Sequence, residues 1–201
     1  LSKMIKDEYI KKKKTKVIGL TGAQGTGKST ISKGLSERLN LIHRIGTGFV
    51  REIVRQFINN DKQYMFGYTF QADSQEELIN RFVRQSKELV GAVKACIERA
   101  RAEGTSLIIE GAHIIPGLFN DCEVSLSIVL RNRDSEKHHD MILGPTHFNR
   151  KITNEEFSQN LILQDYICGE AKKHQVPIID VARKDLMLDK ICSLMDEKND
   201  N

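Results

Sequence analysis

A glycine-rich segment near the start of the chain has the residue types and the spacing needed to bind a phosphate chain. It reads G-A-Q-G-T-G-K-S and matches the pattern G-x-x-x-x-G-K-[ST] at every defined position. Small residues let successive backbone N–H groups converge on a phosphate, and the lysine adds a mobile positive charge. We therefore expect a nucleotide phosphate site made by Gly22, Ala23, Gln24, Gly25, Thr26, Gly27, Lys28, Ser29 and Thr30.

Two side chains of this segment have separate expected roles. Lys28 would neutralise the β- and γ-phosphates of ATP, and the Ser29 hydroxyl would coordinate the Mg²⁺ that bridges them. Both roles belong to phosphoryl transfer, so ATP and Mg²⁺ are the expected cofactors. A signalling GTPase is disfavoured, because the chain has no N-K-x-D and no D-x-x-G after its third predicted strand.

The elements that must position these residues alternate along the chain. Short apolar runs predict strands at residues 16–20, 41–45, 106–110, 124–130 and 176–179. Apolar residues spaced three or four apart predict helices at residues 29–39, 49–58, 74–101, 153–173 and in a last segment after 184. This alternation predicts an α/β fold of the P-loop NTPase kind, with three α/β/α layers and a five-stranded parallel sheet.

Helix starts are marked by polar residues. Ser74 and Thr153 are each followed three residues later by glutamate, which predicts capping boxes, and Asp185 is the expected cap of the last helix. Residues 1–15 form a basic tail, residues 16–196 a single domain and residues 197–201 a polar tail. No repeat or linker divides the domain.

Glu110 follows the third strand, at the edge of the sheet where ligands of such folds bind. It would hold Mg²⁺ through a water molecule or orient the hydroxyl group that receives the phosphate. The alternative is a buried carboxylate that only supports the turn. We assign Glu110 to catalysis.

Basic residues gather after the fourth strand, around Gly144 and Pro145. Such a cluster fits a helical lid that closes over the phosphates, excludes water and stabilises the charge of the transition state. Arg131 and Arg150 are the expected catalytic members, and a solvated basic helix is the alternative for each residue singly. The full cluster contains Arg131, Arg133, Lys137, His138, His139, His147 and Arg150.

Composition is that of an ordinary globular domain, with 39% hydrophobic and 29% charged residues and a formal net charge of +4. Residues 11–14 are all lysine, and a solvated tail is favoured over a nucleic-acid contact. The four cysteines are far apart and have no zinc-ligand spacing. No apolar run is long enough to span a membrane and no signal peptide is visible, so we expect a cytoplasmic protein.

Several segments resemble the 2-phosphoglycerate kinase family. They are the glycine-rich loop, I-G-T-G-F-V-R-E at 45–52, I-E-G-A-H-I-I-P-G at 109–117, and residues 163–166 with 176–180. The E-G-x-H-x-x-P-G part is the most distinctive, because a general P-loop kinase does not need it. The resemblance implies a nucleoside-kinase-like P-loop fold and transfer of phosphate from ATP to the free hydroxyl of 2-phosphoglycerate.

The resemblance also suggests which residues meet the acceptor, a small anionic hydroxyl compound. Arg51 would clamp a carboxylate or phosphate bidentately, while Arg55, one turn later, is more simply a helix-surface charge. Thr47 and His113 complete the predicted acceptor site, although His113 could equally be a packed histidine. The chain departs from the family pattern G-T-D-S-x-R-E at Gly48, which stands where an aspartate could contact the acceptor hydroxyl.

Three functions therefore compete. The leading one is a kinase for a small acidic metabolite, similar to 2-phosphoglycerate. The second keeps the chemistry but uses a nucleoside, a nucleotide or an RNA end, as the basic tail and Gly48 allow. The third is a nucleotide-binding regulator without an acceptor. Oligomeric state and the preference for ATP over GTP are not encoded in any pattern that we recognise.

Overall fold

The computed structural model describes residues 15–59, 61–67, 69–70, 72–144 and 152–197. Its five strands form one sheet in the order β2-β3-β1-β4-β5, and every neighbouring pair is parallel. The strands are β1 (Val17–Thr21), β2 (His43–Gly46), β3 (Leu107–Glu110), β4 (Leu126–Arg131) and β5 (Ile178–Asp180). This confirms the predicted fold class and parallel sheet. The strand bounds differ from the predicted ones by one or two residues.

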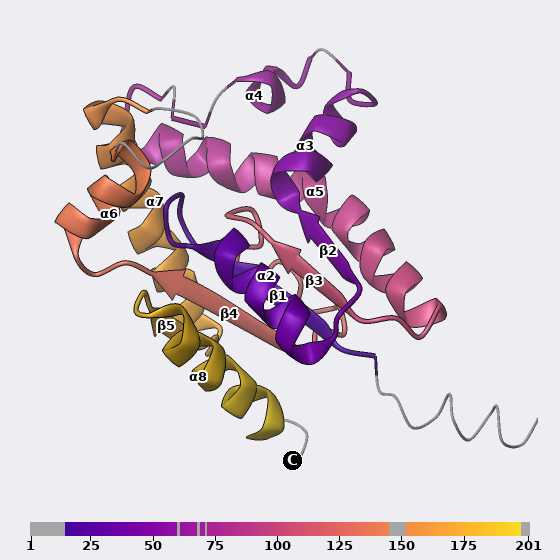
Figure 1. The fold of residues 1–201 in the computed structure, drawn as a ribbon. Helices are drawn as coiled ribbons and strands as arrows, with labels where there is room; N and C mark the ends of the chain where they lie inside the picture. Colours follow the sequence, from indigo (N-terminus) through magenta and orange to yellow (C-terminus); the bar gives the residue numbers. More distant parts are fainter. Residues whose placement is uncertain (1–14, 60, 68, 71, 145–151, 198–201) are drawn as a thin grey trace, which may run out of the picture.

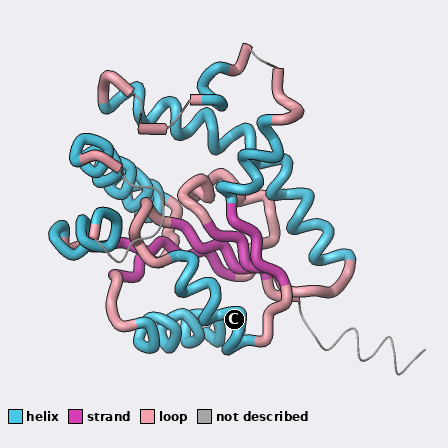
Figure 2. The backbone as a smooth tube through the Cα atoms, turned by 45° about the horizontal axis from the view of Figure 1, so that its top comes forward, coloured by secondary structure: helices cyan, strands magenta, loops and turns pink. Residues whose placement is uncertain are grey.

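Helices cover both faces of the sheet (Figures 1 and 2). On one face lie α2 (Lys28–Leu39) and α8 (Lys184–Glu197), whose apolar side chains form one core cluster with the strands. On the other lie α5 (Gln75–Ala102) and α7 (Asn154–Lys173), which form two further clusters. The shorter α3 (Thr47–Arg55), α4 (Gln63–Phe66) and α6 (Ser135–Leu143) lie beyond the carboxyl edge of the sheet.

Strand β1 occupies the centre of the sheet, and all five of its residues are buried there. It pairs with β3 on one side and with β4 on the other. All strands run the same way, so the ends of β1, β2 and β3 meet at one edge. The glycine-rich loop, the start of α3 and Glu110 therefore come together there.

The predicted helix caps were partly correct. Thr153 and Glu156 form the reciprocal capping box of α7. Ser74 accepts a hydrogen bond from the Glu77 N–H, but the Glu77 carboxylate accepts from Asp73 instead of from Ser74, so the second half of that box was wrong. Asp185 lies inside the first turn of α8, where its charge still favours the helix dipole, and so is not the cap.

Helix α3 presents an unexpected apolar face to solvent. The exposed fractions are 79% for Phe49 and 61% for Ile53 in α3 and 83% for Phe57 in the turn after it, whereas Val50 is buried. The apolar spacing predicted a helix at residues 49–58 but did not specify which of these side chains face solvent. The helix packs on α5 through Val50, which forms a buried cluster with Met65 and Leu89.

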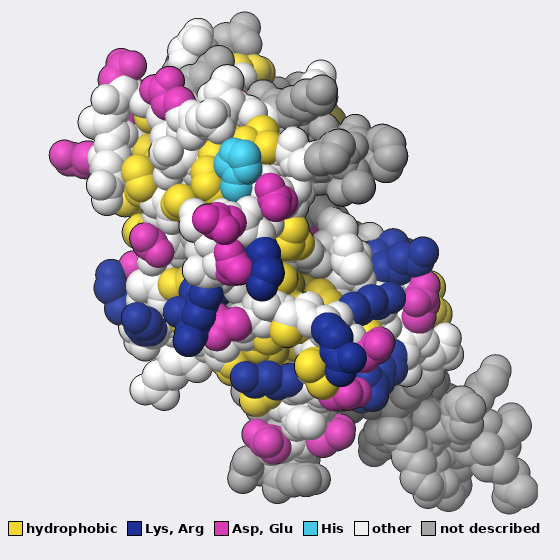
Figure 3. Space-filling model, turned by 60° about the vertical axis from the view of Figure 1, so that its left-hand side comes forward, with side chains coloured by type: hydrophobic (Ala, Val, Ile, Leu, Met, Phe, Trp, Pro, Cys, Tyr) yellow, Lys and Arg dark blue, Asp and Glu magenta, His cyan; other side chains and the backbone are white. Residues whose placement is uncertain are grey.

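Charges on the face drawn in Figure 3 are mixed, with Lys and Arg side chains interspersed among Asp and Glu. Ion pairs of the described residues include Arg38–Asp189 at 2.6 Å and Arg133–Asp180 at 2.9 Å. No helix within the described residues is long and apolar enough to cross a membrane.

Candidate active site

The glycine-rich loop joins β1 to α2 and has the backbone shape that a phosphate nest requires. Gly22, Gly25 and Gly27 all have positive φ, and Gly27 is the residue before α2. A Cβ at Gly25 would lie 2.3 Å from Ile142 Cγ1 of α6. Glycine is therefore required there both by the backbone angle and by the packing of α6 on the loop.

Two helices hold this loop through the backbone of Gln24. Asn160 of α7 accepts a hydrogen bond from the Gln24 N–H at 3.0 Å and donates one to the Gln24 carbonyl at 3.0 Å. His138 of α6 lies 2.6 Å from the same carbonyl through Nε2. Since a carbonyl only accepts, His138 must carry a proton on Nε2. Burial lowers the pKa of His138, which favours this neutral state.

Lys28 folds back over the loop. Its ammonium donates to the Ala23 carbonyl at 2.6 Å, and the Thr26 hydroxyl donates to the same oxygen at 2.9 Å. Burial lowers the pKa of Lys28 to about 8, an effect that the nearby Glu110 charge partly opposes. Because a lysine ammonium is carried on a flexible stem, it can turn towards an incoming phosphate chain.

Glu110 ends β3 beside this loop, as predicted. Its Oε2 atom is buried and has no hydrogen-bond partner within the described chain. The next residue, Gly111, has φ +147°, and a Cβ there would lie 1.8 Å from Thr47 Oγ1. Thr47 is buried against that backbone at the start of α3. Its hydroxyl therefore lies at the turn that carries Glu110.

A cavity of about 220 Å³ opens between the loop and α3. It brings together the predicted loop residues Ala23, Gln24 and Lys28 with the predicted acceptor residues Arg51 and His113, from three separate segments of the chain. No Asp or Glu lines it among the residues that the structure describes. Its lining consists of Ala23, Gln24, Lys28, Arg51, Thr69, Phe70, Phe82, Ala112, His113, Asn160 and Leu163.

Arg51 reaches this cavity from α3 with only 14% of its side chain exposed. Its Nη1 lies 3.4 Å from both Thr69 Oγ1 and Gln85 Oε1. Gln85 in turn accepts from Thr69 at 2.8 Å and donates to the Tyr64 carbonyl at 2.6 Å. This network orients the guanidinium and ties the segment around α4 to the long helix α5.

Arg55 does not behave as predicted. Its side chain is only 15% exposed, so it is not a helix-surface charge. It donates to the carbonyls of Met65 at 2.5 Å and of Gly67 at 3.4 Å and also pairs with Glu52. Arg55 therefore fastens the α4 segment to α3.

His113 lies in the turn after β3 and is 7% exposed. Its Nδ1 lies 3.0 Å from the hydroxyl of Ser86 on α5, and its ring packs on Phe82 with centroids 5.2 Å apart. Burial, and secondarily the positive charges of Arg51, Arg55 and Lys28, lower its pKa to about 3. His113 is thus neutral at physiological pH.

Three buried polar residues of the site were missed by sequence reasoning: Gln85, Ser86 and Asn160. Each interrupts an apolar stripe, since Gln85 and Ser86 lie between Phe82 and Leu89, and Asn160 lies between Phe157 and Leu163. Polar residues at core-facing positions of a helix need buried partners, which is a signal of function that the sequence does contain.

The basic residues predicted to form a lid do not all lie at the loop. Arg131 and Arg133 pair with Asp180 at the end of β5. Lys137 pairs with Asp134, and His139 lies 3.2 Å from Asn154 Oδ1. Only His138 contacts the loop. His147 and Arg150 fall outside the described residues.

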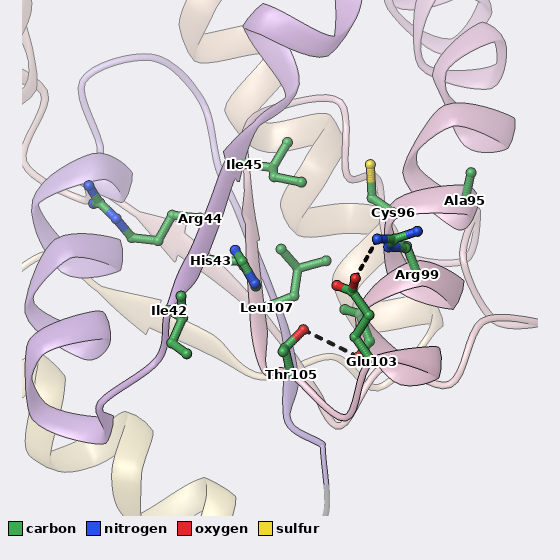
Figure 4. A pocket seen from close by; sticks show the side chains of 11 residues that line it. Ile42, His43, Arg44, Ile45, Ala95, Cys96, Arg99, Glu103, Thr105 and Leu107 are labelled. Carbon is green, nitrogen blue, oxygen red and sulfur yellow. Dashed lines mark hydrogen bonds and ion pairs between the residues drawn. The ribbon is translucent and has the colours of Figure 1, made fainter.

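A second and larger cavity, of about 490 Å³, lies away from this site. It is formed by β2 and the C-terminal half of α5 and contains an Arg99–Glu103 ion pair (Figure 4). None of the predicted site residues lines it. Size alone therefore does not identify the active site in this molecule.

The described residues fit a magnesium ion held mainly by a nucleotide. No three His, Cys, Asp or Glu side chains among them are grouped so as to bind a metal unaided. The exposed Ser29 hydroxyl at the start of α2 and the unpartnered Oε2 of Glu110 are the oxygen donors beside the loop. Mg²⁺ typically combines one or two protein oxygens with water and phosphates.

Comparison with known proteins identifies relatives over most of the chain. The model of the family described as AAA domain matches residues 18–143. The 2-phosphoglycerate kinase of Methanocaldococcus jannaschii is 29% identical, and the match covers 90% of this chain and 63% of that protein. That of Pyrococcus horikoshii is 31% identical, covering 82% of this chain and 58% of that protein. The predicted resemblance is confirmed, although the chain spans only about three fifths of these relatives.

Two solved structures share the fold. An unliganded sugar kinase from Janibacter sp. has a TM-score of 0.57 and 13% identity, covering 90% of this chain and 95% of its own. Shikimate kinase from Acinetobacter baumannii in complex with shikimate has a TM-score of 0.56 and 10% identity, covering 91% of this chain and 94% of its own. At such identities the likeness concerns the fold alone.

Proposed function

This chain belongs to the AAA domain family, and on that premise we propose that it is an ATP-dependent kinase whose acceptor is the hydroxyl of a small acidic metabolite, similar to 2-phosphoglycerate. One observation carries the proposal. The lysine of the phosphate loop and the arginine of α3 line the same cavity. A donor phosphate and an anionic acceptor can therefore meet there.

The size and charge of the cavity favour this acceptor over a nucleotide. At about 220 Å³ it is smaller than the roughly 300–1,000 Å³ of pockets that take drug-sized ligands. Lys28 and Arg51 supply positive charge, and a forked guanidinium suits a carboxylate or a phosphate. A nucleoside or RNA end would need more room than this cavity offers, so that alternative is less well supported.

The roles of the chain's own residues follow from their positions. Backbone N–H groups of the loop and Lys28 would hold the phosphates, and Arg51 would hold the acid group of the acceptor. Mg²⁺, held by Ser29 and by Glu110 through water, would supply charge neutralisation. The turn bearing Glu110 and His113 borders the acceptor. Arg131, Thr47 and a cytoplasmic location remain predictions.

The test is ADP release from MgATP with a panel of acceptors: 2-phosphoglycerate, 3-phosphoglycerate, nucleosides, nucleotides and 5′-hydroxyl RNA. We expect selective turnover of a phosphoglycerate. Arg51→Met should raise the KM of that acceptor roughly 10- to 100-fold, the cost of a lost hydrogen bond to a charged group, and leave the KM of ATP unchanged.

Arg99→Met is the matched control, since Arg99 is an exposed arginine that pairs with Glu103 and does not line the cavity that contains Lys28 and Arg51. Turnover with nucleosides, nucleotides or RNA alone would assign the fold to a different acceptor. ADP release that no acceptor stimulates would favour a regulator.

A further inference from the structure

We infer that His113 presents an unprotonated Nε2 to the cavity, where it accepts a hydrogen bond from the hydroxyl that receives the phosphate, and that Ser86 is the positioning residue that sets this tautomer. The inference rests on the proposed function for its substrate. The tautomer of His113 is argued from contacts within the chain and does not depend on that function.

The contacts of Ser86 determine where the proton of His113 lies. The Ser86 hydroxyl lies 2.8 Å from the Phe82 carbonyl, to which it can only donate. Its single proton is then used, so its oxygen can only accept from His113 Nδ1, 3.0 Å away. This arrangement makes two hydrogen bonds, whereas the opposite tautomer makes one. Both residues are buried, where an unmade hydrogen bond is costly.

The charges around the ring favour the same tautomer. Lys28 and Arg51 line the cavity with His113, and both are cationic. A nitrogen lone pair facing two cations is stabilised, while an N–H would be repelled. Nε2 has no hydrogen-bond partner in the described part of the chain. It is also not among the unpartnered side-chain atoms that are buried from solvent. Nε2 is therefore accessible, and because His113 lines the cavity we infer that Nε2 opens onto it.

A neutral hydrogen-bond acceptor beside the substrate hydroxyl suits phosphoryl transfer. The hydroxyl oxygen bonds to the γ-phosphorus as the bond from that phosphorus to the ADP oxygen breaks. In the loose transition state of such reactions, little proton removal precedes bond breaking. Nε2 would therefore align the oxygen first, and the proton would leave late, through Nε2 to water. The low pKa of His113 fits an aligning group better than a strong base.

The first experiment needs no substrate. Nitrogen-15 NMR of the histidine rings in the full chain, with His113→Phe to assign the signal, reports which ring nitrogen carries the proton. We expect the Nδ1–H tautomer in the wild type and a mixture in Ser86→Ala, with Ser86→Thr resembling the wild type. An Nε2–H tautomer in the wild type would overturn the inference even if the protein proves to be a kinase.

The second experiment compares two isosteres with the wild-type enzyme. His113→Gln keeps a polar atom near the position of Nε2, whereas His113→Asn keeps one only near Nδ1. His113→Asn should lower kcat with 2-phosphoglycerate roughly 10- to 100-fold, at or below the lower end of the range for a full general base, because His113 mainly aligns the hydroxyl. His113→Gln should retain more than a fifth of the activity, and the Kd of MgATP should be unchanged in both.

Equal losses in the two variants, or an unchanged kcat in His113→Asn, would contradict the hydroxyl contact. An inactive wild type would contradict the proposed function, and the NMR result would still decide the tautomer.

Discussion

At the scale of single residues, the site is organised around a lysine held in an unfavourable setting. Lys28 is half-buried and donates to the Ala23 carbonyl, and desolvation lowers its pKa to about 8. A triphosphate placed beside it would restore the preference for the charged form, because opposite charges raise the pKa of an amine. Nucleotide binding and protonation of Lys28 are therefore coupled.

This coupling predicts proton uptake. At pH 9 most Lys28 side chains of the free protein would be neutral, so binding of MgATP should take up close to one proton. Isothermal titration calorimetry in two buffers of different ionisation enthalpy measures this number. Lys28→Arg, which stays charged throughout, should bind without uptake. A wild type that binds MgATP at pH 9 with no proton uptake would show that Lys28 is already charged.

At the scale of elements, the phosphate loop depends on helices that come much later in the chain. Asn160 of α7 bonds both the N–H and the carbonyl of Gln24, and α6 packs on Gly25 through Ile142. Parallel strand order brings these elements together, since β1 and β4 are neighbours. The loop is therefore fixed before any nucleotide arrives.

We predict that Asn160→Ala weakens binding of MgATP. Two hydrogen bonds to the loop backbone are lost, each worth about 1 kcal/mol, so the Kd of MgATP without acceptor should rise roughly 30-fold. Gln159→Ala is the matched control. Gln159 is next to Asn160 in α7, but its side chain donates to the Ala72 carbonyl and not to the loop. Equal affinities in Asn160→Ala and the wild type would mean that the loop needs no clamp.

The elements also show how far the sequence leads. Short apolar runs predicted all five strands, and the sequence placed the glycine-rich loop between β1 and α2. The orientation of α3 was not predicted, since Phe49, Ile53 and Phe57 form a stripe that is indistinguishable from a core face. The contacts of Ser86 with His113 and of Asn160 with Gln24 are long-range, and no local pattern specifies them.

At the scale of the whole molecule, burial of His113 links the site to stability. The folded chain keeps this ring neutral to about pH 3, whereas an unfolded histidine takes a proton near pH 6.5. The unfolded state therefore binds more protons as the pH falls. The stabilising effect is fully present above pH 6.5 and is lost towards pH 3.

We therefore predict that the free energy of unfolding falls between pH 6 and pH 4, with His113 contributing up to about 1.4 kcal/mol per pH unit. Urea unfolding at several pH values should show a shallower fall in His113→Gln. His139→Gln, at a half-exposed position, is the control and should keep the wild-type slope. Parallel pH profiles for His113→Gln and the wild type would contradict the neutral, buried assignment.

The fold, the loop and the cationic cavity together make one central claim, that this molecule moves a phosphoryl group from ATP to a small anionic alcohol. Transfer of ³²P from γ-labelled ATP to 2-phosphoglycerate, followed by separation of the products, tests it most directly. We expect labelled 2,3-bisphosphoglycerate from the wild type and about 100- to 1,000-fold less from Lys28→Ala, the scale of one lost transition-state contact. Label that never leaves ATP or appears only as inorganic phosphate, or equal transfer by Lys28→Ala, would contradict the claim.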